Sequence, residues 1–501
     1  MSMGRREQQQ DSMLVPVVRG PSHIFYDRLN AHLDGLKFDE KVESLCEGFF
    51  EEKERRGQPS IAPGMYFRML LVGYFEGIES ERGIEWRCTD SLSLRRFLRV
   101  GDTARVPDHS TLSRMRHRLD EAVFSEVFDV VLGLVAQHGL LQGKTLGVDS
   151  TQLRADASMK AIVRKDTGEN YQEYTKRLAA AAGEAEKPTA DDARRHDRKR
   201  KGKKTSNKEW ESKTDEDARI ARMKNGTTRL AHKAEHVIDL DSGAIAEVGL
   251  HPADAHDTAT LELSLLNAVA RIEAATGNEK APQVVTDKGY HKVGLLLVLA
   301  AMGFRTYIPE PKQKGQRHWE DKGDGAAQVF HQNRARCGRT KGKRLLRKRG
   351  ELVERPNAHL YETGGMRRLR LRGRGNANKR LLIHAAAANL GLVMRKTHGF
   401  GTPRGLAQAA RAVFAVFAAW CMRALGVRPR ILEWVGGHGA PSPPRASQNA
   451  NCPSTRAERL LQRAASALTT RDGRGGLRGC RDRPPRCSRR ARGRGSESRS
   501  R

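Results

Sequence analysis

The sequence predicts a mixed α/β protein in which a sheet flanked by helices follows an all-helical N-terminal domain. Three observations support this fold class. Residues 24–139 contain only helix-type patterns with polar or Gly/Pro breaks, strand-length apolar runs alternate with helical stretches from Lys144 onward, and the end is rich in Pro, Gly, Ser and Arg. We therefore expect a disordered start, a helical domain, an α/β domain, a C-terminal helix and a disordered Arg-rich tail, at 1–20, 21–140, 141–400, 401–435 and 436–501.

The charge of the 501-residue chain indicates a polyanionic partner. The formal net charge is +32; residues 441–501, with 16 Arg, no Lys and 4 acidic residues, account for +12 and leave +20 for the rest. A cytoplasmic, nucleoid-associated protein is expected, because no apolar run approaches the roughly 18 residues of a membrane helix and the first residues lack an apolar signal core. Seven scattered cysteines without a C-x2-C pair indicate free thiols rather than a zinc site.

The helical domain is expected to bind DNA. Its predicted helices include 25–36, 41–52, 63–75, 80–89 and 93–99. In the segment PDHSTLSRMRHRL, Asp108 or Ser110 can cap a helix whose exposed face carries Arg114, Arg116 and Arg118. Such a helix could dock on DNA as part of a helix-turn-helix-like unit, and the alternative is a solvated basic face on a packed helix.

The first strand of the α/β domain carries an acidic residue. In KTLGVDSTQLRAD, Leu146 and Val148 lead directly into Asp149. A buried carboxylate is costly unless it is paired, protonated or bound to a metal, so Asp149 is a candidate functional residue. The alternative is an Asp just past the strand end in an Asx-type turn.

The order of the elements that follow sets the topology. A charged insert at about 159–228 contains one helical stretch and a basic run, including Arg198, Lys199 and Arg200, which we interpret as a clamp for an acidic polymer rather than a merely solvated segment. Next come a hairpin with its turn at 241–243, a helix at 258–276, a strand at 283–286, a helix at 293–302, a strand at 305–309, an irregular basic segment at 312–348, and helices at 351–361 and 379–395. This order is the connectivity of the RNase H-like fold.

On that fold, three carboxylates are expected to lie close together. Asp149 lies on the first strand, Asp287 ends the fourth, and a Glu lies on the helix after the fifth. Carboxylates this close repel one another unless cations lie between them, and hard oxygen ligands suit Mg²⁺ or Mn²⁺. Two such ions would support in-line displacement at phosphorus.

The motifs LGVDST, VVTDKGYH and ELVERPNAHLYETGGMRR, followed by a helix ending NLGLVMR, resemble the DDE transposases of bacterial insertion sequences. PDHSTLSRMRHRL is similar to that family's N-terminal domain. The resemblance covers roughly residues 21–403 and implies that Asp149, Asp287 and Glu354 are the catalytic, metal-binding residues. Glu351 and Glu362 compete for the third role, and Lys288, Tyr290 and Arg355 match positions suited to contacting DNA phosphates or element ends.

The resemblance implies Mg²⁺-dependent hydrolysis at the ends of the element and attack of the freed 3′-hydroxyl on target DNA, by a homodimer or larger assembly. ATP use is not expected, because no G-x4-G-K-[ST] motif occurs. Two alternatives remain: a stand-alone RNase H-like nuclease, and an inactive DNA-binding remnant. The Arg-rich tail fits either a DNA-binding arm or out-of-frame translation, and the second would favour the remnant.

Overall fold

The computed structural model describes residue 3 and residues 22–50, 60–101, 104–183, 187–203, 205–312, 318–319 and 322–424. Met1–Leu425 forms one compact unit. The predicted disordered start, apart from Met3, and the predicted disordered tail lie outside the described residues, as does the last part of the predicted helix at 401–435.

The N-terminal part is helical, as predicted. Its helices are α1 Ile24–Gly35, α2 Phe38–Cys46, α3 Pro63–Glu76, α4 Glu81–Asp90, α5 Leu92–Phe97, α6 His109–Arg118 and α7 Glu121–Gln137. Asp108 caps α6, because its side chain accepts a hydrogen bond of 2.7 Å from the Thr111 amide. Ser110 instead donates its hydroxyl to the Asp108 carboxylate at 2.7 Å. The helices α1, α3, α4 and α5 match the predicted segments within two residues, whereas α2 ends at Cys46 instead of the predicted 52 and is followed by the 3-10 turn Glu47–Phe49.

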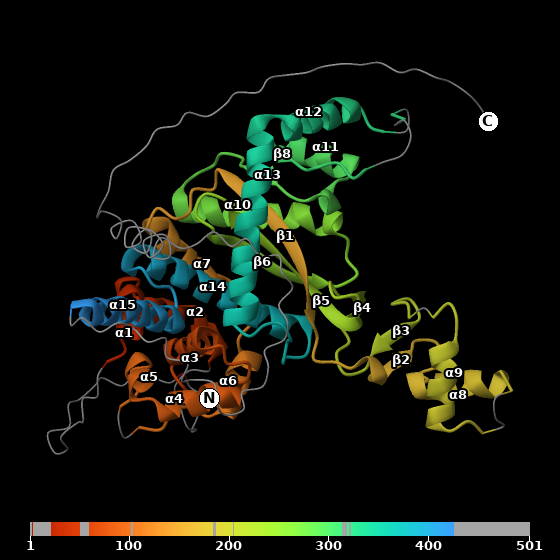
Figure 1. The fold of residues 1–501 in the computed structure, drawn as a ribbon, viewed down its shortest axis with the longest axis horizontal. Coiled ribbons are helices and arrows are strands. Elements are labelled where there is room, and N and C mark those ends of the chain that lie inside the picture. Colours follow the sequence, from red (N-terminus) through yellow and green to blue (C-terminus); the bar gives the residue numbers. More distant parts are fainter. Residues whose placement is uncertain are drawn as a thin grey trace, which may run out of the picture. The chain divides into compact units, whose positions relative to one another are not determined.

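The sheet has the RNase H-like order (Figure 1). Its strands are β1 Thr145–Arg154, β4 Arg219–Arg222, β5 Thr228–Asp239, β6 Ile245–Pro252, β7 Gln283–Val285 and β8 Arg305–Tyr307. β1 pairs antiparallel with β5 on one side and parallel with β7 on the other, β7 pairs parallel with β8, and β4 and β6 both pair with β5. The β5–β6 hairpin turns at Gly243, whose φ of +85° is a conformation that glycine adopts readily. The predicted mixed sheet is confirmed.

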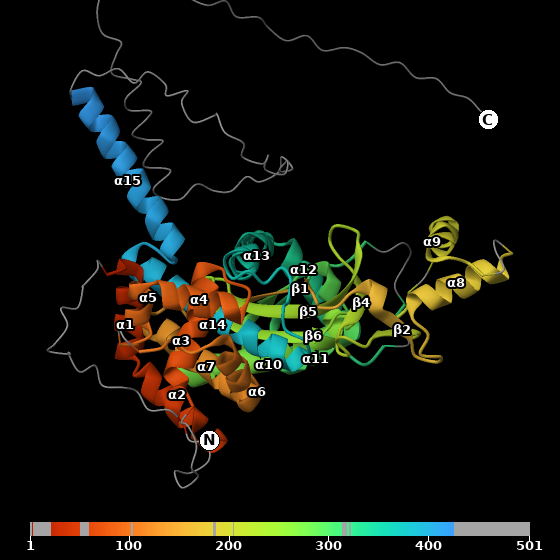
Figure 2. The same ribbon diagram turned by 90° about the horizontal axis from the view of Figure 1, so that it is seen from below.

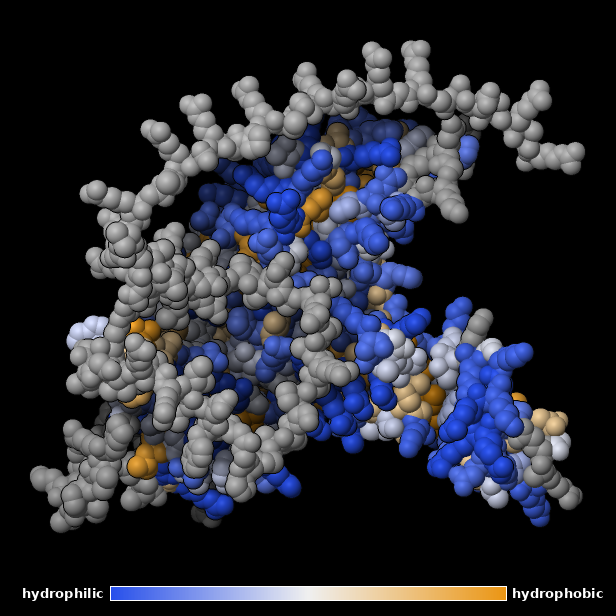
Figure 3. All heavy atoms as spheres, in the orientation of Figure 1, coloured by the Kyte–Doolittle hydropathy of each residue, from blue (hydrophilic) through white to orange (hydrophobic). Residues whose placement is uncertain are grey.

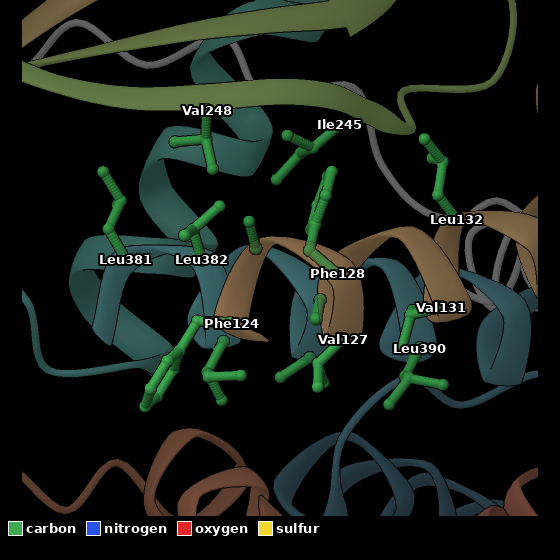
Figure 4. Close-up of a cluster of buried hydrophobic side chains, with 14 of the residues drawn as sticks. Phe124, Val127, Phe128, Val131, Leu132, Ile245, Val248, Leu381, Leu382 and Leu390 are labelled. Carbon is green, nitrogen blue, oxygen red and sulfur yellow. The ribbon is translucent and has the colours of Figure 1, made fainter. Parts of the chain in front are cut away.

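Helices cover both faces of the sheet (Figure 2). α13 Thr340–Ala358 lies on one face, and α7, α10 Asp257–Thr276 and α14 Arg374–His398 lie on the other. Figure 4 shows how α7, β6 and α14 share one core, in which Phe128 of α7, Val248 of β6 and Leu382 of α14 point toward one another. The helical part and the α/β part are therefore joined by common apolar packing.

The segment at 312–348 is not irregular throughout, so that prediction is wrong. α11 Val293–Ala301 and β8 are followed by α12 Ala326–Gly338, and α13 starts at Thr340, well before the predicted Glu351. α13 continues into a π-helical turn, His359–Thr363. α12 shows little amphipathic pattern, and the few apolar residues of α13 lie among many Lys and Arg residues, which favoured an irregular segment.

The charged insert is more ordered than predicted. It contains the 3-10 turn Met159–Ala161, β2 Ile162–Arg164, α8 Tyr171–Ala181, α9 Ala190–Lys199 and β3 Trp210–Ser212. Ile162, Trp210 and Ile220 belong to a small separate core under these elements. Half of the basic run is thus helix α9 rather than a mobile segment, and the surface over α8 and α9 is largely hydrophilic (Figure 3).

The last described helix, α15 Pro403–Ala424, exposes several large apolar side chains, including Phe414, Phe417 and Trp420. Among the described residues, no helix combines the length and the apolar character needed to cross a membrane.

Candidate active site

Asp149 and Asp287 lie just beyond the last residues that pair β1 with β7 in parallel. The parallel pairing of these strands ends at Gly147 and Val285. Asp149 lies two residues beyond on β1, which continues to Arg154, so it is within the strand and not in a turn after it. Asp287 lies two residues beyond Val285. The parallel pairing therefore brings both residues to the same region of the sheet, and the pKa of Asp149, raised first by burial, is raised further by the charge of Asp287.

The carboxylate of Asp149 is partly buried and is neutralised by a side chain of the same chain. Burial raises its pKa, and Arg349 and Lys224 oppose that shift. Arg349 Nη2 lies 2.9 Å from Asp149 Oδ1, and its Nε donates to the Val148 carbonyl at 3.1 Å. The Arg349 guanidinium of α13 therefore occupies a position from which a metal ion would contact Asp149.

Asp287 is held by the turn that follows it. Its Oδ1 accepts a hydrogen bond of 2.8 Å from the Gly289 amide in the 3-10 turn Lys288–Tyr290. Tyr290 anchors this turn, since its buried hydroxyl donates to Glu235 Oε1 at 2.9 Å. The prediction of Tyr290 as a phosphate-positioning group is therefore wrong: its side chain is 1% exposed and points into the protein.

A polar network lies under the two aspartates, on the opposite face of β1. Ser150 donates its hydroxyl to Asp257 Oδ1 at 2.8 Å, and Lys233 Nζ donates to the Thr260 hydroxyl at 3.1 Å. Thr260 in turn donates to Glu235 at 2.8 Å. The network ties β1, β5 and α10 to the turn that carries Asp287.

Glu354 does not form a group of three carboxylates with Asp149 and Asp287 among the described residues. It is exposed on α13, next to Val353, which packs against Gly147 of β1. Its competitors also lie at the surface: Glu351 is exposed, and Glu362 pairs with Arg367. In the part of the chain that the structure describes, no three His, Cys, Asp or Glu side chains are grouped closely enough to hold a metal ion.

The basic face predicted for α6 differs from the observed one. Arg114 is exposed, as predicted, but Arg116 is buried and forms an ion pair with Glu81. Arg118 is half-buried, with its guanidinium 5.2 Å from the centre of the Phe50 ring. The prediction that Arg116 lies on the exposed face is wrong, because α6 turns that side chain toward α4.

Other predicted DNA contacts lie at the surface. Arg198 and Lys199 are exposed at the end of α9, and Lys288 and Arg355 are exposed beside the two carboxylate motifs. Arg200 is half-buried, 3.2 Å from Asp197 and over the Tyr174 ring. Of these three residues, Arg198 and Lys199 are thus open to an outside partner.

Sequence reasoning missed three residues around Asp149: Arg349, Lys224 and Tyr361. The hydroxyl of Tyr361 is buried in the π-helical turn and has no hydrogen-bond partner among the described residues. Burial raises the pKa of this tyrosine, and the charge of Asp149 raises it further. Arg349 could have been found from its position on the helix of Glu354, but it fell between the segment predicted to be irregular, 312–348, and the helix predicted to start at Glu351.

Two family models match the chain. The model described as transposase domain (DUF772) matches residues 16–118, and the model described as transposase DDE domain matches residues 192–390. The chain belongs to the DDE transposases of the insertion-sequence type. The second match includes Asp287 and Glu354 of this transposase but begins after Asp149.

A solved structure is also similar to this transposase at low identity. It is titled "Cryo-EM structure of piggyBac transposase synaptic complex with hairpin DNA (SNHP)", with a TM-score of 0.31, 8% identity, and coverage of 75% of this chain and 76% of that chain. No curated protein matches the transposase sequence.

Proposed function

We propose that this transposase hydrolyses phosphodiester bonds at the ends of an insertion element and joins the freed 3′-hydroxyl to target DNA. The observation that carries the proposal is the pair Asp149 and Asp287, which both lie two residues beyond the parallel pairing of β1 and β7 in a chain of the DDE transposase family. Adjacent carboxylates on rigid strands suit phosphoryl transfer, where catalysis depends mainly on positioning and charge stabilisation.

The donor set at this edge fits a hard divalent cation in part. Asp149 and Asp287 supply carboxylate oxygens. The Arg349 guanidinium contacts Asp149 at an oxygen that a metal ion would also bind. We propose Glu354 as the third ligand, supplied by the exposed side of α13. Mg²⁺ or Mn²⁺ bound by these residues would lower the pKa of a water or 3′-hydroxyl and stabilise the leaving oxygen.

The residues of the chain have separate roles in this proposal. β1 and β7 fix the two aspartates, and the Tyr290–Glu235 hydrogen bond holds the turn of Asp287 in place. Arg349 neutralises Asp149 in the absence of substrate. Lys288 and Arg355 are exposed beside the carboxylates and are proposed to contact DNA phosphates.

DNA contacts away from the carboxylates are proposed for Arg114 on α6 and for Arg198 and Lys199 on α9. These three side chains are exposed, and the chain is strongly basic. Arg118 already contacts the Phe50 ring and Arg200 is paired with Asp197, so we propose secondary roles in DNA binding for these two residues. A homodimer or larger assembly on paired element ends is proposed from the family.

The test is cleavage and joining by the purified full chain on DNA carrying the element's own ends, with Mg²⁺ or with EDTA. We expect metal-dependent joining that is lost in Asp149→Ala, Asp287→Ala and Glu354→Ala. Glu351→Ala is the matched control on the same helix and should retain activity. Loss in Glu351→Ala with retention in Glu354→Ala would reassign the third carboxylate.

The second candidate is an inactive DNA-binding remnant. It is favoured by Glu354 lying outside any group of three potential metal ligands among the described residues. Binding of element ends by the unmutated chain without any cleavage in Mg²⁺ or Mn²⁺ would establish the remnant and reject the active enzyme.

A further inference from the structure

A cavity of about 160 Å³ lies where α3, α4, α6 and α7 meet α14. None of its lining residues belongs to the carboxylate site. Its volume is comparable to that of an engineered cavity of about 150 Å³ that binds benzene, so one six-membered ring fits.

The inner wall of this cavity is apolar and aromatic. Tyr66, Ile84, Phe124 and Ile383 line it and are almost completely buried. Tyr66 and Phe124 are themselves in contact, with ring centres 6.3 Å apart and nearly perpendicular planes. A flat ring placed here would meet aromatic faces and aliphatic side chains.

The same cavity holds more positive than negative charge. Four basic side chains line it, against the two acidic side chains of Glu79 and Glu81. Glu81 pairs with Arg116, and Glu79 pairs with Arg370 at 3.0 Å. The remaining basic residues, Lys379 and Arg380, form no ion pair within 4 Å among the described residues, and the nearby charges of Asp120 and Glu121 on Lys379 and of Glu79 and Glu81 on Arg380 do not outweigh the effect of their burial.

Lys379 and Arg380 are held by backbone carbonyls instead. Lys379 Nζ donates to the Arg116 carbonyl at 3.0 Å, and Arg380 Nη1 and Nη2 donate to the carbonyls of Glu79 and Ile78 at 2.6 and 3.2 Å. Burial lowers the pKa of both groups, that of Arg380 to about 10. Keeping two cations in a mainly apolar wall is costly unless an anion joins them.

Two buried nitrogen atoms of the lining also lack a hydrogen-bond partner among the described residues: Arg116 Nε and His384 Nδ1. Burial and Arg380 lower the pKa of His384 well below its usual value, so the ring is neutral. Because Arg380 Nε donates to His384 Nε2 at 3.3 Å, the ring proton belongs on Nδ1. Residues that line the cavity therefore carry unused hydrogen-bond donors as well as an excess of positive charge.

We infer that this cavity binds one nucleoside 5′-monophosphate unit, with a pyrimidine-sized ring against Tyr66 and Phe124 and the phosphate near Lys379 and Arg380. The sugar would lie toward Glu79 and Arg370, whose side chains are 40% and 47% exposed and mark the open side. The unit is either a free nucleotide or the last nucleotide of a DNA strand, which share this chemistry. The inference does not depend on the carboxylate chemistry proposed above.

The test is a calorimetric titration of the full chain in EDTA with thymidine 5′-monophosphate, thymidine and inorganic phosphate. Working in EDTA separates this site from any metal-dependent reaction. We expect the monophosphate to bind at least about tenfold more tightly than either fragment, since ring and phosphate contribute together.

Two variants probe the two halves of the site. Lys379→Gln removes a phosphate contact and should weaken binding about tenfold or more, while Leu70→Phe adds bulk at the lining of the ring site and should abolish it. Lys176→Gln removes one charge from the exposed side of α8 and is the matched control. Thermal unfolding of each variant confirms that it is folded.

The source of the nucleotide is tested with a duplex carrying one unpaired 2-aminopurine nucleotide at its 3′ end. Fluorescence quenching that Leu70→Phe removes, without binding of thymidine 5′-monophosphate, would assign the site to DNA strand ends. Binding of the free nucleotide that both variants weaken would assign it to free nucleotide. The inference is overturned if phosphate binds as tightly as the monophosphate, if neither variant weakens binding, or if neither probe binds.

Discussion

At the scale of single residues, the site is defined by how Asp149 is neutralised. Its carboxylate is partly buried and lies near that of Asp287, and both conditions raise its pKa. Arg349 of α13 is the cation that lowers this pKa most strongly. Arg349 is itself only 14% exposed, so this ion pair is weakly screened by solvent. A divalent ion and the guanidinium would then compete for the same oxygen.

We therefore expect Arg349→Gln to bind Mn²⁺ more tightly than the unmutated chain, by about three- to tenfold, because the competing cation is removed. The measurement is Mn²⁺ binding followed by electron paramagnetic resonance in the absence of DNA. Arg334→Gln, which removes an exposed guanidinium paired with Glu310, is the control and should bind as before. An unchanged or weaker affinity in Arg349→Gln would show that the guanidinium does not compete with the metal.

Glu247 gives a pH dependence that belongs to the fold rather than to the site. Burial raises the pKa of this β6 carboxyl to about 7 from an ordinary 4.5, although Arg271 Nε lies 2.6 Å away. The folded state then binds the proton more tightly than the unfolded state. Stability from this group is present below about pH 4.5 and is lost as the pH rises toward 7.

The free energy of unfolding should therefore fall between pH 5 and pH 8 by about 1–3 kcal/mol more in the unmutated chain than in Glu247→Gln. Denaturant titrations of both chains at the two pH values measure this difference. Glu273→Gln removes an exposed carboxylate from α10 and should behave as the unmutated chain does. Equal pH dependence in Glu247→Gln and the unmutated chain would mean that Glu247 is ionised in the folded state at pH 5.

At the scale of elements, the longer strands and the apolar helices could be predicted from the sequence, whereas the short strands of the insert and most of the Lys- and Arg-rich helices after it could not. The β5–β6 hairpin and α10 were predicted because apolar residues recur at strand or helix spacing and a glycine turn lies between the strands. α12, most of α13 and α9 were missed because they are rich in polar and charged residues, Lys and Arg above all. The candidate site could be predicted only as far as its elements. Asp149 and Asp287 were assigned to the correct strands, but the contact of Arg349 and the exposure of Glu354 depend on how α13 lies across the sheet.

The contact of α13 with β1 is close at Gly147. A Cβ added there would lie 2.5 Å from Leu240 Cδ2 and 3.1 Å from Val353 Cγ2, so the glycine is required by close approach and not by its backbone angles. Val353 directly precedes Glu354. The distance between the strand carboxylates and the helix carboxylate is therefore set at this point.

Gly147→Ala should destabilise the fold by about 1–3 kcal/mol, because the added methyl group overpacks this region. It should also lower DNA cleavage at temperatures where the protein remains folded, because α13 is pushed away from β1. Gly133→Ala is the control: it lies within α7 with no atom within 4 Å of an added Cβ, and alanine there should be neutral or slightly stabilising. Normal stability and cleavage in Gly147→Ala would show that the helix adjusts without cost.

At the scale of the whole molecule, charge and fold are separate properties. The net charge of +32 predicted a polyanionic partner but not which basic residues are available to it. The structure separates them: Arg116 is buried in the helical core, Arg200 is paired with Asp197, and Arg198 is exposed on the insert. Composition alone could not make this distinction, because it depends on which side of each helix faces the protein.

Two pairs of basic residues on α9 allow a test in which the change in net charge is held constant. Arg194 and Arg195 are exposed but paired with Asp191 and Asp192, at 3.1 and 2.5 Å. Arg198 and Lys199 are exposed without a partner among the described residues. Only the second pair is therefore free to replace counterions on a DNA backbone.

We expect Arg198→Gln with Lys199→Gln to reduce the slope of log affinity against log salt by about 1–2, because each phosphate that a cation neutralises on duplex DNA contributes about 0.9 to that slope. The measurement is fluorescence anisotropy over a range of salt concentrations. Arg194→Gln with Arg195→Gln removes the same net charge and should change the slope by less than half as much, because these side chains are already neutralised within the helix. Equal slopes for the two double variants would mean that DNA responds to the total charge of the insert and not to the free end of α9, and the proposed clamp would be rejected.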